Sequence, residues 1–330
     1  MKRVLALSDS LSPWHSFWIR FGQYIPSLSG QIHVSENPAL VDQLRCGDTL
    51  FVYRFIPEWW TLLGRLPILR RKGIRLISDV DDCLWQAPLN WERSRLKGFT
   101  KMLGQCDLIT CSTEPLHELL CVMFPRQKIL LVRNSTPPLT PAKKASLPPA
   151  VTLCWTGAPW MRPEDLALLR PMARWIQENQ LPVRWRHLGH APKKLSFASA
   201  IGVPPETVEQ IPLCGHQDYL NQLSGTIGLA PMTTGCFNNF KSELKLLEFS
   251  GAGMAWIASD VPAYRGCCER WGWPGRLCTS TEDWIHHLQA LLNPLVREAE
   301  ACELRQLAHT KQSHTMALKQ WNSLLLGDFS

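Results

Sequence analysis

Short apolar runs recur along the chain, and stretches in which apolar positions follow a helical period lie between them. Runs rich in Val, Ile and Leu are typical of strands that are buried on both faces of a parallel sheet. They predict strands at residues 3–8, 31–34, 49–53, 74–78, 108–111 and 129–132, and a second series at 151–156, 183–188, 208–211, 226–230 and 255–259. Amphipathic segments at 57–72, 114–123 and 312–326 predict helices.

A proline-rich stretch separates the two series of strands. Residues 136–150 hold five prolines and show no apolar period, which is typical of a linker. Strands that alternate with helices on both sides of it predict an α/β fold of two doubly wound, Rossmann-like domains that face each other across a cleft. The expected parts are an N-terminal domain over 1–135, the linker over 136–150, a C-terminal domain over 151–311, and a last helix over 312–330 that could return to the N-terminal domain.

Composition narrows the class of ligand. The 330 residues are 45% hydrophobic and 19% charged, as in folded globular proteins, and the net charge of +7 is spread along the chain. That distribution fits an anionic small ligand or an anionic surface better than duplex nucleic acid, so we expect no nucleic-acid partner. No apolar run reaches the roughly 18 residues of a membrane span. The apolar stretch at 4–7 is also too short for a signal peptide.

Cysteine and tryptophan usage bear on location. None of the twelve cysteines forms a C-x-x-C motif, and most lie in or beside apolar runs, which predicts reduced, structural thiols and a cytoplasmic setting. Fifteen tryptophans stand against four tyrosines. Indole rings stack on sugars and also lie at membrane interfaces, although most tryptophans are packing residues. A peripheral contact with the inner face of a membrane is therefore compatible with the composition.

One block in the second half carries the clearest candidate chemistry. On a helix, Lys241, Lys245 and Glu248 would share one narrow face, and Asn238 and Asn239 would cap the start of that helix. Two lysines one turn apart repel each other unless an anion lies nearby. A solvated helix face is the alternative for this pattern alone. The glycine-containing helix end and apolar run that follow favour a phosphate held by lysines, with a carboxylate for sugar hydroxyls.

Four stretches together resemble a known family. The block 241–264 contains K-S-x-x-K-x-L-E and I-A-S-D-V-P-A-Y, and residues 155–159 with 164–166 form a strand end, a glycine loop and a helix start. The other two stretches are 77–85 with 48–54, and 107–116 with 132–134. In this order and spacing they are similar to the glycosyltransferases of the two-domain GT-B fold, in the family-4 or group 1 branch.

The resemblance implies that a hexose is transferred from a nucleotide donor, UDP- or GDP-linked, to a saccharide, a glycolipid or a polysaccharide precursor of the cell envelope. It assigns the ribose hydroxyls to Glu248, the diphosphate to Lys245 or Lys241, and close backbone approach to Gly157. Because lysine, arginine and helix N-termini neutralise the diphosphate in this fold, neither a metal nor a cofactor is expected. The donor-binding residues implied are Gly157, Asn239, Lys241, Ser242, Lys245 and Glu248.

One position departs from the family pattern. Family-4 members commonly carry an acid eight residues before the ribose-binding glutamate, and here that position is Phe240. Asn238, Asn239 or Glu243 could replace the acid. With this departure, the contact to the donor sugar and the retention of anomeric configuration stay open. A degenerate GT-B protein that serves only as a binding or scaffold partner is a further alternative.

The acids Asp79, Asp81 and Asp82 follow a predicted strand and allow several interpretations. A D-x-D pair holds a divalent metal in the other major glycosyltransferase fold. The same pattern opens the haloacid-dehalogenase phosphatases, with Asp79 as nucleophile and magnesium bound beside Asp81. Three predicted strands precede this one, which favours acceptor-side contacts or helix caps from Asp79 and Asp82. Arg54 ends its own strand and could meet an anionic acceptor or form an ion pair.

Histidines add weak candidates. His15 follows the first predicted strand, so it and Asp82 are the candidates for a general base or a sugar contact, and the catalytic residue stays unknown. His187 and His190 lie three residues apart with no acid nearby, so we expect loop histidines rather than metal ligands.

Overall fold

The computed structural model describes residues 2–54, 58–87, 93–137, 151–190, 195–223 and 225–327, with only the backbone of 93 and 94. The chain divides into two compact units. The first comprises Met1–Asn134, Asn239–Ser242 and Thr315–Ser330, and the second comprises Ser135–Asn238 and Glu243–His314. Most of the expected linker, residues 138–150, lies outside the described residues.

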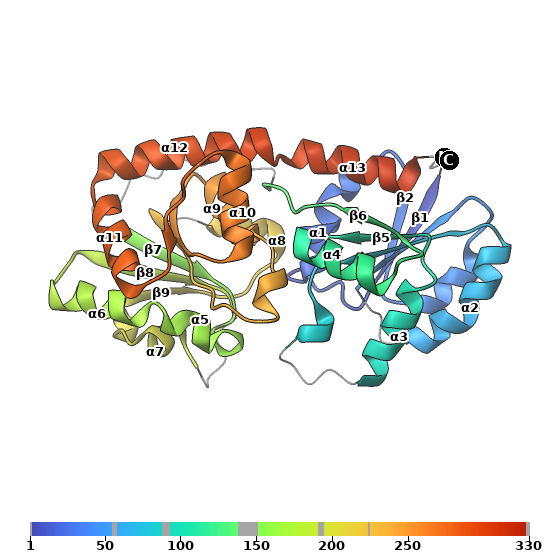
Figure 1. Ribbon diagram of the computed structural model, residues 1–330, viewed down its shortest axis with the longest axis horizontal. Helices are drawn as coiled ribbons and strands as arrows, with labels where there is room; N and C mark the ends of the chain where they lie inside the picture. The colour runs from blue at the N-terminus through green and yellow to red at the C-terminus, as the bar shows by residue number, and fades with distance from the viewer. Residues whose placement is uncertain are drawn as a thin grey trace. The chain divides into compact units, whose positions relative to one another are not determined.

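The first unit is built on a parallel sheet of six strands in the order β2-β1-β3-β4-β5-β6 (Figure 1). The strand order reverses between β1 and β3, and ligands bind beside the carboxyl ends of strands at such a point. The strands are β1 (Arg3–Ser8), β2 (Gln31–Ser35), β3 (Thr49–Tyr53), β4 (Arg75–Val80), β5 (Leu108–Cys111) and β6 (Lys128–Leu131).

Helices cover both faces of this sheet. Alternate residues of β1 point to opposite faces, so Leu5 and Leu7 pack with α2, α3 and α4, while Val4 and Ala6 pack with α1 and α13. Trp321 of α13 is fully buried in the second of these clusters. The helices are α1 (Ser16–Arg20), α2 (Trp59–Arg71), α3 (Arg93–Leu103), α4 (Glu114–Met123) and α13 (His314–Leu326).

The second unit holds another parallel sheet of six strands, in the order β12-β11-β10-β7-β8-β9. This is the doubly wound order, and its reversal lies between β7 and β10. The strands are β7 (Val151–Thr156), β8 (Val183–Leu188), β9 (Val208–Ile211), β10 (Ile227–Ala230), β11 (Ala255–Ser259) and β12 (Leu277–Cys278). Both sheets confirm the predicted α/β class with two doubly wound, Rossmann-like domains. The sequence pattern missed β12, which has only two residues.

Two layers of helices enclose the second sheet. One layer holds α5 (Pro163–Ala167), α6 (Arg170–Glu178), α7 (Phe197–Ile201) and α11 (Thr281–Leu292). The other holds α8 (His216–Gln222), α9 (Leu244–Gly251), α10 (Pro262–Trp271) and α12 (Pro294–Lys311). At Gly228 of β10, an added Cβ would lie 2.4 Å from the ring of Phe249, so this glycine lets α9 approach the sheet closely. Within the described ranges, no helix has the length and apolarity needed to cross a membrane.

Candidate functional site

Four polar side chains form a connected set at the carboxyl end of β7. Lys245 of α9 donates from Nζ to Oγ1 of Thr156 at 2.8 Å, and it also donates to the carbonyl oxygen of Thr156. Tyr219 of α8 donates to Oε2 of Glu248 at 2.7 Å, and its hydroxyl lies 3.3 Å from Oγ1 of Thr156. The set therefore runs from Lys245 through Thr156 and Tyr219 to Glu248, at the point where the order of the sheet reverses.

Burial gives this set unusual acid–base properties. Glu248 is 3% exposed, and burial raises its pKa, while the Tyr219 hydrogen bond and Lys245 oppose that rise. Burial lowers the pKa of Lys245 to about 8, with Glu248 acting against the fall and Arg162 adding to it. Among the described ion pairs, none joins a carboxylate to Lys245 within 4.0 Å. An anion bound next to this ammonium would offset the free-energy cost of its desolvation and favour the charged form.

A glycine loop lies beside the set. Gly157 follows β7 with φ of +140°, in the region that favours glycine, and its N–H donates to the carbonyl oxygen of Leu188 at 3.0 Å. Gly189 has φ of +145°, and a Cβ there would lie 2.1 Å from the carbonyl oxygen of Gly157. Two glycines thus let the ends of β7 and β8 approach each other more closely than side chains allow.

His187 contacts this loop through the carbonyl oxygen of Gly157. It lies within β8 and is fully buried, so the expectation of a loop histidine is wrong for His187, whereas His190 is exposed after the strand. Its Nε2 is 2.9 Å from the carbonyl oxygen of Gly157, and its Nδ1 is 2.6 Å from Oε1 of Gln210. The period of two along β8 places His187 on the buried side with Trp185, which was the available signal.

Arg162 is a second cation that the sequence reasoning missed. It precedes α5, donates from Nη1 to Oδ1 of Asn238 at 3.1 Å, and has its guanidinium carbon 5.5 Å from the centroid of the Phe237 ring. Its charge helps to lower the pKa of Lys245, so the two cations act on one region. The available signal was a basic residue directly before a proline that starts a helix after the Gly157 loop.

The predicted helix face is only partly present. Helix α9 begins at Leu244, and Asn238–Phe240 form a separate short 3-10 helix. The expectation that Lys241 shares one helix with Lys245 and Glu248, capped by Asn238 and Asn239, is therefore wrong. Asn238 instead donates to the carbonyl oxygen of Thr233 at 2.9 Å, and Asn239 is exposed. Lys245 and Glu248 share the helix, whereas Lys241 and Ser242 do not.

Residues 239–242 group with the first unit. Lys241 pairs with Asp82 at 2.7 Å, and the hydroxyl of Ser242 accepts a hydrogen bond from Asn134 at 2.9 Å. Phe240 packs against the core formed with α2 to α4, and its carbonyl oxygen accepts from Oγ1 of Thr113 at 3.1 Å. The phenylalanine that replaces the family's acid thus contributes to packing.

Glu243, offered as a replacement for that acid, is 3% exposed. It pairs with Arg270 at 2.6 Å and accepts from Nε2 of Gln312 at 2.7 Å. Both partners belong to its own unit, and the side chain is committed to these structural contacts rather than to a ligand.

At the carboxyl ends of β3 and β4 in the first unit, charged side chains also gather. Arg54 donates from Nη2 to Asp81 at 2.8 Å and to Asp82 at 3.1 Å, and Tyr53 donates to Asp81 at 2.6 Å. Burial acts to raise the pKa of Asp81, but the charge and hydrogen bonds of Arg54 outweigh it and lower the pKa to about 2. The backbone of Arg54 has φ of +54°, which is uncommon outside glycine and costs about 1 kcal/mol or more.

Asp79 does not line a binding surface. Its side chain is fully buried, and both oxygens accept hydrogen bonds from the guanidinium of Arg20 at 2.9 Å, with Thr110 as a third donor. This burial contradicts the expectation of Asp79 as an acceptor-side contact, and it disfavours Asp79 as a phosphatase nucleophile. Asp82 stays partly exposed between Arg54 and Lys241. No cluster of metal-ligating side chains occurs among the described residues.

His15 caps helix α1. Its Nδ1 accepts from the N–H of Phe17 at 3.4 Å, so the proton of the neutral ring lies on Nε2, which is 3.4 Å from Oδ1 of Asp9. Burial lowers the pKa of His15, with the charge of Asp9 opposing the fall. Since both ring nitrogens have partners, this geometry favours a structural role for His15. It adds Asp9, directly after β1, as an acid at the same sheet edge.

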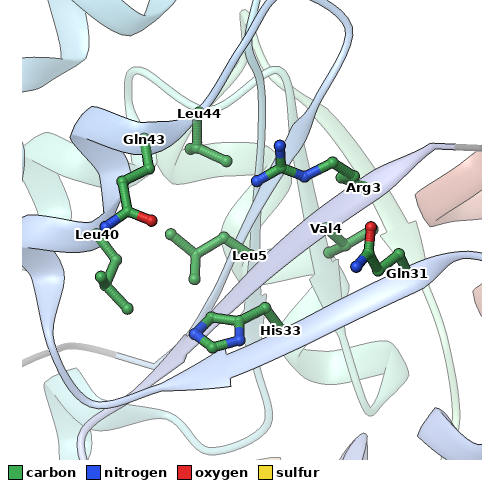
Figure 2. A pocket seen from close by; sticks show the side chains of 8 residues that line it. All are labelled: Arg3, Val4, Leu5, Gln31, His33, Leu40, Gln43 and Leu44. Carbon is green, nitrogen blue, oxygen red and sulfur yellow. The ribbon is translucent and has the colours of Figure 1, made fainter.

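A cavity of about 290 Å³ opens elsewhere on the first unit (Figure 2). Its lining comes from β1, β2 and the short helix Pro38–Gln43, and includes Arg3, His33 and Gln43. These positions lie toward the amino-terminal halves of the strands, away from the carboxyl ends where the charged groups gather. None of the candidate site residues lines this cavity.

Comparison with known proteins rests on structure alone, because no family model and no curated protein matches this sequence. The pneumococcal O-GlcNAc transferase GtfA, solved with UDP and GlcNAc, is 15% identical with a TM-score of 0.60, over 87% of this chain and 58% of GtfA. The chain thus spans little more than half of that protein. A glycosyltransferase from Rickettsia africae is 9% identical, with a TM-score of 0.64 and coverage of 99% of each chain.

A third solved structure, named as a UDP-N-acetylglucosamine 2-epimerase from Listeria monocytogenes, is 12% identical with a TM-score of 0.55. It covers 99% of this chain and 97% of that one. At these identities the likeness establishes the fold alone, two Rossmann-like α/β domains as in GT-B proteins. It does not distinguish between the activities named for these structures.

Proposed function

We propose that this chain is a glycosyltransferase that moves a hexose from a nucleoside-diphosphate sugar to an acceptor hydroxyl. The observation that carries the proposal is the set Lys245, Thr156, Tyr219 and Glu248 beside the Gly157 loop. It joins a cation, a carboxylate and a close-approach backbone at the switch point of a doubly wound sheet, where such folds bind nucleotides.

The diphosphate is assigned to Lys245 and Arg162. In the transfer, the bond between the anomeric carbon and the diphosphate oxygen breaks, and a bond to the acceptor oxygen forms. Negative charge then builds on the departing diphosphate, and fixed cations near that oxygen lower the barrier. The lowered pKa of Lys245 supports this role, because a bound anion would stabilise the charged form of this half-buried lysine.

Glu248 is assigned to the hydroxyls of the donor ribose. Tyr219 occupies Oε2 at 2.7 Å and so fixes the rotation of the carboxylate. Its remaining acceptor sites suit two neighbouring hydroxyls. The family-4 branch and the choice of UDP or GDP belong to the same proposal, which also needs no metal because the protein's own cations carry the charge.

The acceptor side is assigned to the first unit. Asp9, Arg54 and Asp82 lie at the carboxyl ends of its strands, and a carboxylate there could take the proton of the acceptor hydroxyl. A saccharide or lipid-linked precursor of the cell envelope, met at the inner face of a membrane, is the acceptor class we propose. The exposed indoles of Trp14 and Trp60 support such a contact.

The test begins with binding. UDP or GDP should raise the thermal unfolding midpoint, and saturating nucleotide at 100 times its Kd stabilises a protein by about 2.7 kcal/mol. Glu248→Gln should weaken this shift, since an amide offers one acceptor where the carboxylate offers two. Glu298→Gln, on the exposed side of α12, is the matched control and should retain the shift. Absence of a shift with every nucleoside diphosphate would refute the proposal.

Products then separate the remaining alternatives. A glycosyltransferase releases UDP or GDP only as sugar appears on an acceptor. An epimerase instead yields an isomeric sugar nucleotide, and a degenerate binding protein shows nucleotide binding without turnover across donor and acceptor panels. The phosphatase alternative requires magnesium-dependent hydrolysis that depends on Asp79, and the burial of Asp79 speaks against it.

A further inference from the structure

Both ring nitrogens of His187 face hydrogen-bond acceptors. Nε2 lies 2.9 Å from the carbonyl oxygen of Gly157, and Nδ1 lies 2.6 Å from Oε1 of Gln210. The amide orientation of Gln210 follows from its own contacts. Its Nε2 donates to the carbonyl oxygens of Gly189 at 3.3 Å and Ile211 at 3.1 Å, so a flipped amide would set oxygen against oxygen at both places.

Proton counting then gives this ring two distinct states. A neutral imidazole carries one N–H and can donate to one of these acceptors, whereas an imidazolium donates to both. The shorter Gln210 contact assigns the proton of the neutral ring to Nδ1, which turns the Nε2 lone pair toward the Gly157 oxygen. In that tautomer, the 2.9 Å contact to Gly157 becomes a hydrogen bond only when His187 is protonated.

The Gly157 carbonyl controls the next backbone N–H. A trans peptide is planar, so its C=O and N–H point in opposite directions. With the Gly157 oxygen turned toward His187, the N–H of Ala158 points away from that ring. Within the described residues, the hydrogen bonds include none donated by Ala158 N–H.

We propose that His187 is a positioning residue whose protonation holds the Gly157–Ala158 peptide with the Ala158 N–H ready to donate to an anionic oxygen of the bound nucleoside diphosphate. The assignment of the ligand rests on the proposed function. The assignment of the peptide orientation rests on the hydrogen bonds alone.

Neighbouring groups determine how protonation of His187 and nucleotide binding affect each other. Burial lowers the pKa of His187, the hydrogen bonds to Gly157 and Gln210 raise it, and the charge of Lys245 on α9 lowers it. The rings of Trp155 and Phe197, 5.1 and 5.2 Å away, bring no charge. The free protein therefore holds much of this histidine neutral near pH 7. An anion bound at Ala158 N–H favours the protonated ring, so binding takes up a proton and affinity rises as pH falls through the pKa.

Nitrogen NMR of the histidine-labelled protein tests the two states directly. We expect His187 to carry its proton on Nδ1 at high pH and on both nitrogens at low pH, and we expect the Ala158 amide signal to follow that titration. Saturating UDP should raise the titration midpoint. An Ala158 amide that ignores the titration, or a midpoint that UDP leaves unchanged, would overturn the proposal. If UDP does not bind, the proposed function fails, while the Ala158 signal still decides the peptide orientation.

Variants separate this role from general stability. His187→Gln keeps one donor for the Gly157 oxygen but cannot titrate, so its UDP affinity should lose the rise at low pH, by up to about tenfold per pH unit above the His187 pKa. UDP affinity should still fall above about pH 8 in this variant, because Lys245 loses its charge there. His190→Gln, three residues away and exposed, should match the unmodified protein. Equal pH profiles for His187→Gln and the unmodified protein would contradict the proposal.

Gln210→Glu provides an independent check. A carboxylate beside Nδ1 favours the imidazolium, so the NMR midpoint of His187 should move to higher pH. A midpoint that moves down or stays in place would contradict the proton assignment.

Discussion

Replacement of Lys245 by methionine should stabilise the fold while it weakens nucleotide binding. Burial lowers the pKa of this lysine from its ordinary 10.5 to about 8, and its Nζ lies 5.3 Å from the centroid of the Trp155 ring. Methionine has a similar length and no charge, and a thioether beside an aromatic ring is a favourable contact. The substitution therefore removes the cost of desolvation and retains the packing.

The magnitude follows from the lowered pKa of Lys245. A fall of about 2.5 units corresponds to about 3 kcal/mol at 1.36 kcal/mol per unit. The side chain is half-buried, so solvent screening reduces this to about 2 kcal/mol. The hydrogen bonds to Thr156 offset about 1 kcal/mol when they are lost. We expect the free energy of unfolding to rise by about 1 kcal/mol, and UDP affinity to fall by about 10- to 100-fold with the loss of a charged hydrogen bond.

The pH dependence gives a second readout. A group with a depressed pKa in the fold contributes stability above its unfolded pKa and loses it as pH falls through the folded value. Stability that depends on Lys245 should therefore rise from about pH 8 to pH 10.5 and stay at its lower level below pH 8. The methionine variant should lack this rise.

Denaturant titration of the purified protein, with and without UDP, measures both effects. Lys311→Met, in the last turn of α12, is the matched control and should change neither the pH dependence nor the binding. The reasoning is refuted if Lys245→Met lowers the free energy of unfolding by 1 kcal/mol or more, which would mark the lysine as structural (a typical net hydrogen bond is worth about 1 kcal/mol). It is also refuted if the variant binds UDP as tightly as before.

Two further predictions concern buried contacts in each unit. Asp79→Asn leaves the buried guanidinium of Arg20 without a counter-charge, so denaturant titration should show that the free energy of unfolding falls by about 3–5 kcal/mol. Asp42→Asn, which breaks an exposed ion pair, is the control and should have little effect. Equal losses in the two variants would contradict the argument. Gly189→Ala brings a Cβ within 2.1 Å of the Gly157 oxygen and should weaken UDP binding measured by calorimetry. Gly202→Ala, which shares a positive φ but meets nothing within 4 Å, should keep that affinity, and a similar loss in both would refute the role of close packing.

Much of the secondary structure could be predicted from the sequence because the central strands β1, β3, β4, β7 and β11 are buried on both faces. Continuous apolar runs such as 49–53 and 255–259 have no other stable placement than the centre of a parallel sheet, and both match observed strands. The start of α9 was misjudged. Lys241 and Ser242 have helical spacing with Lys245, but Asp82 and Asn134 bind them outside the helix. Such tertiary contacts override local propensity.

Site residues divided in the same way. Gly157, Lys245 and Glu248 could be proposed as candidates from the sequence because the conformation of a glycine loop and the face of a helix are local properties. Thr156 and Tyr219, which connect these candidates, could not, because their hydrogen bonds join elements that are far apart in the sequence.

The sequence by itself determined the α/β class, the two series of strands, and the helix that carries Lys245 and Glu248, since apolar period and turn chemistry act over a few residues. Only the tertiary structure decided which polar groups meet. Asp79 was expected on an accessible surface, and it is buried against Arg20, 59 positions away in the sequence. His187 was expected in a loop, and it lies in a strand next to the Gly157 carbonyl oxygen. Partner choice depends on how strands are ordered in a sheet, and that order is a property of the whole fold.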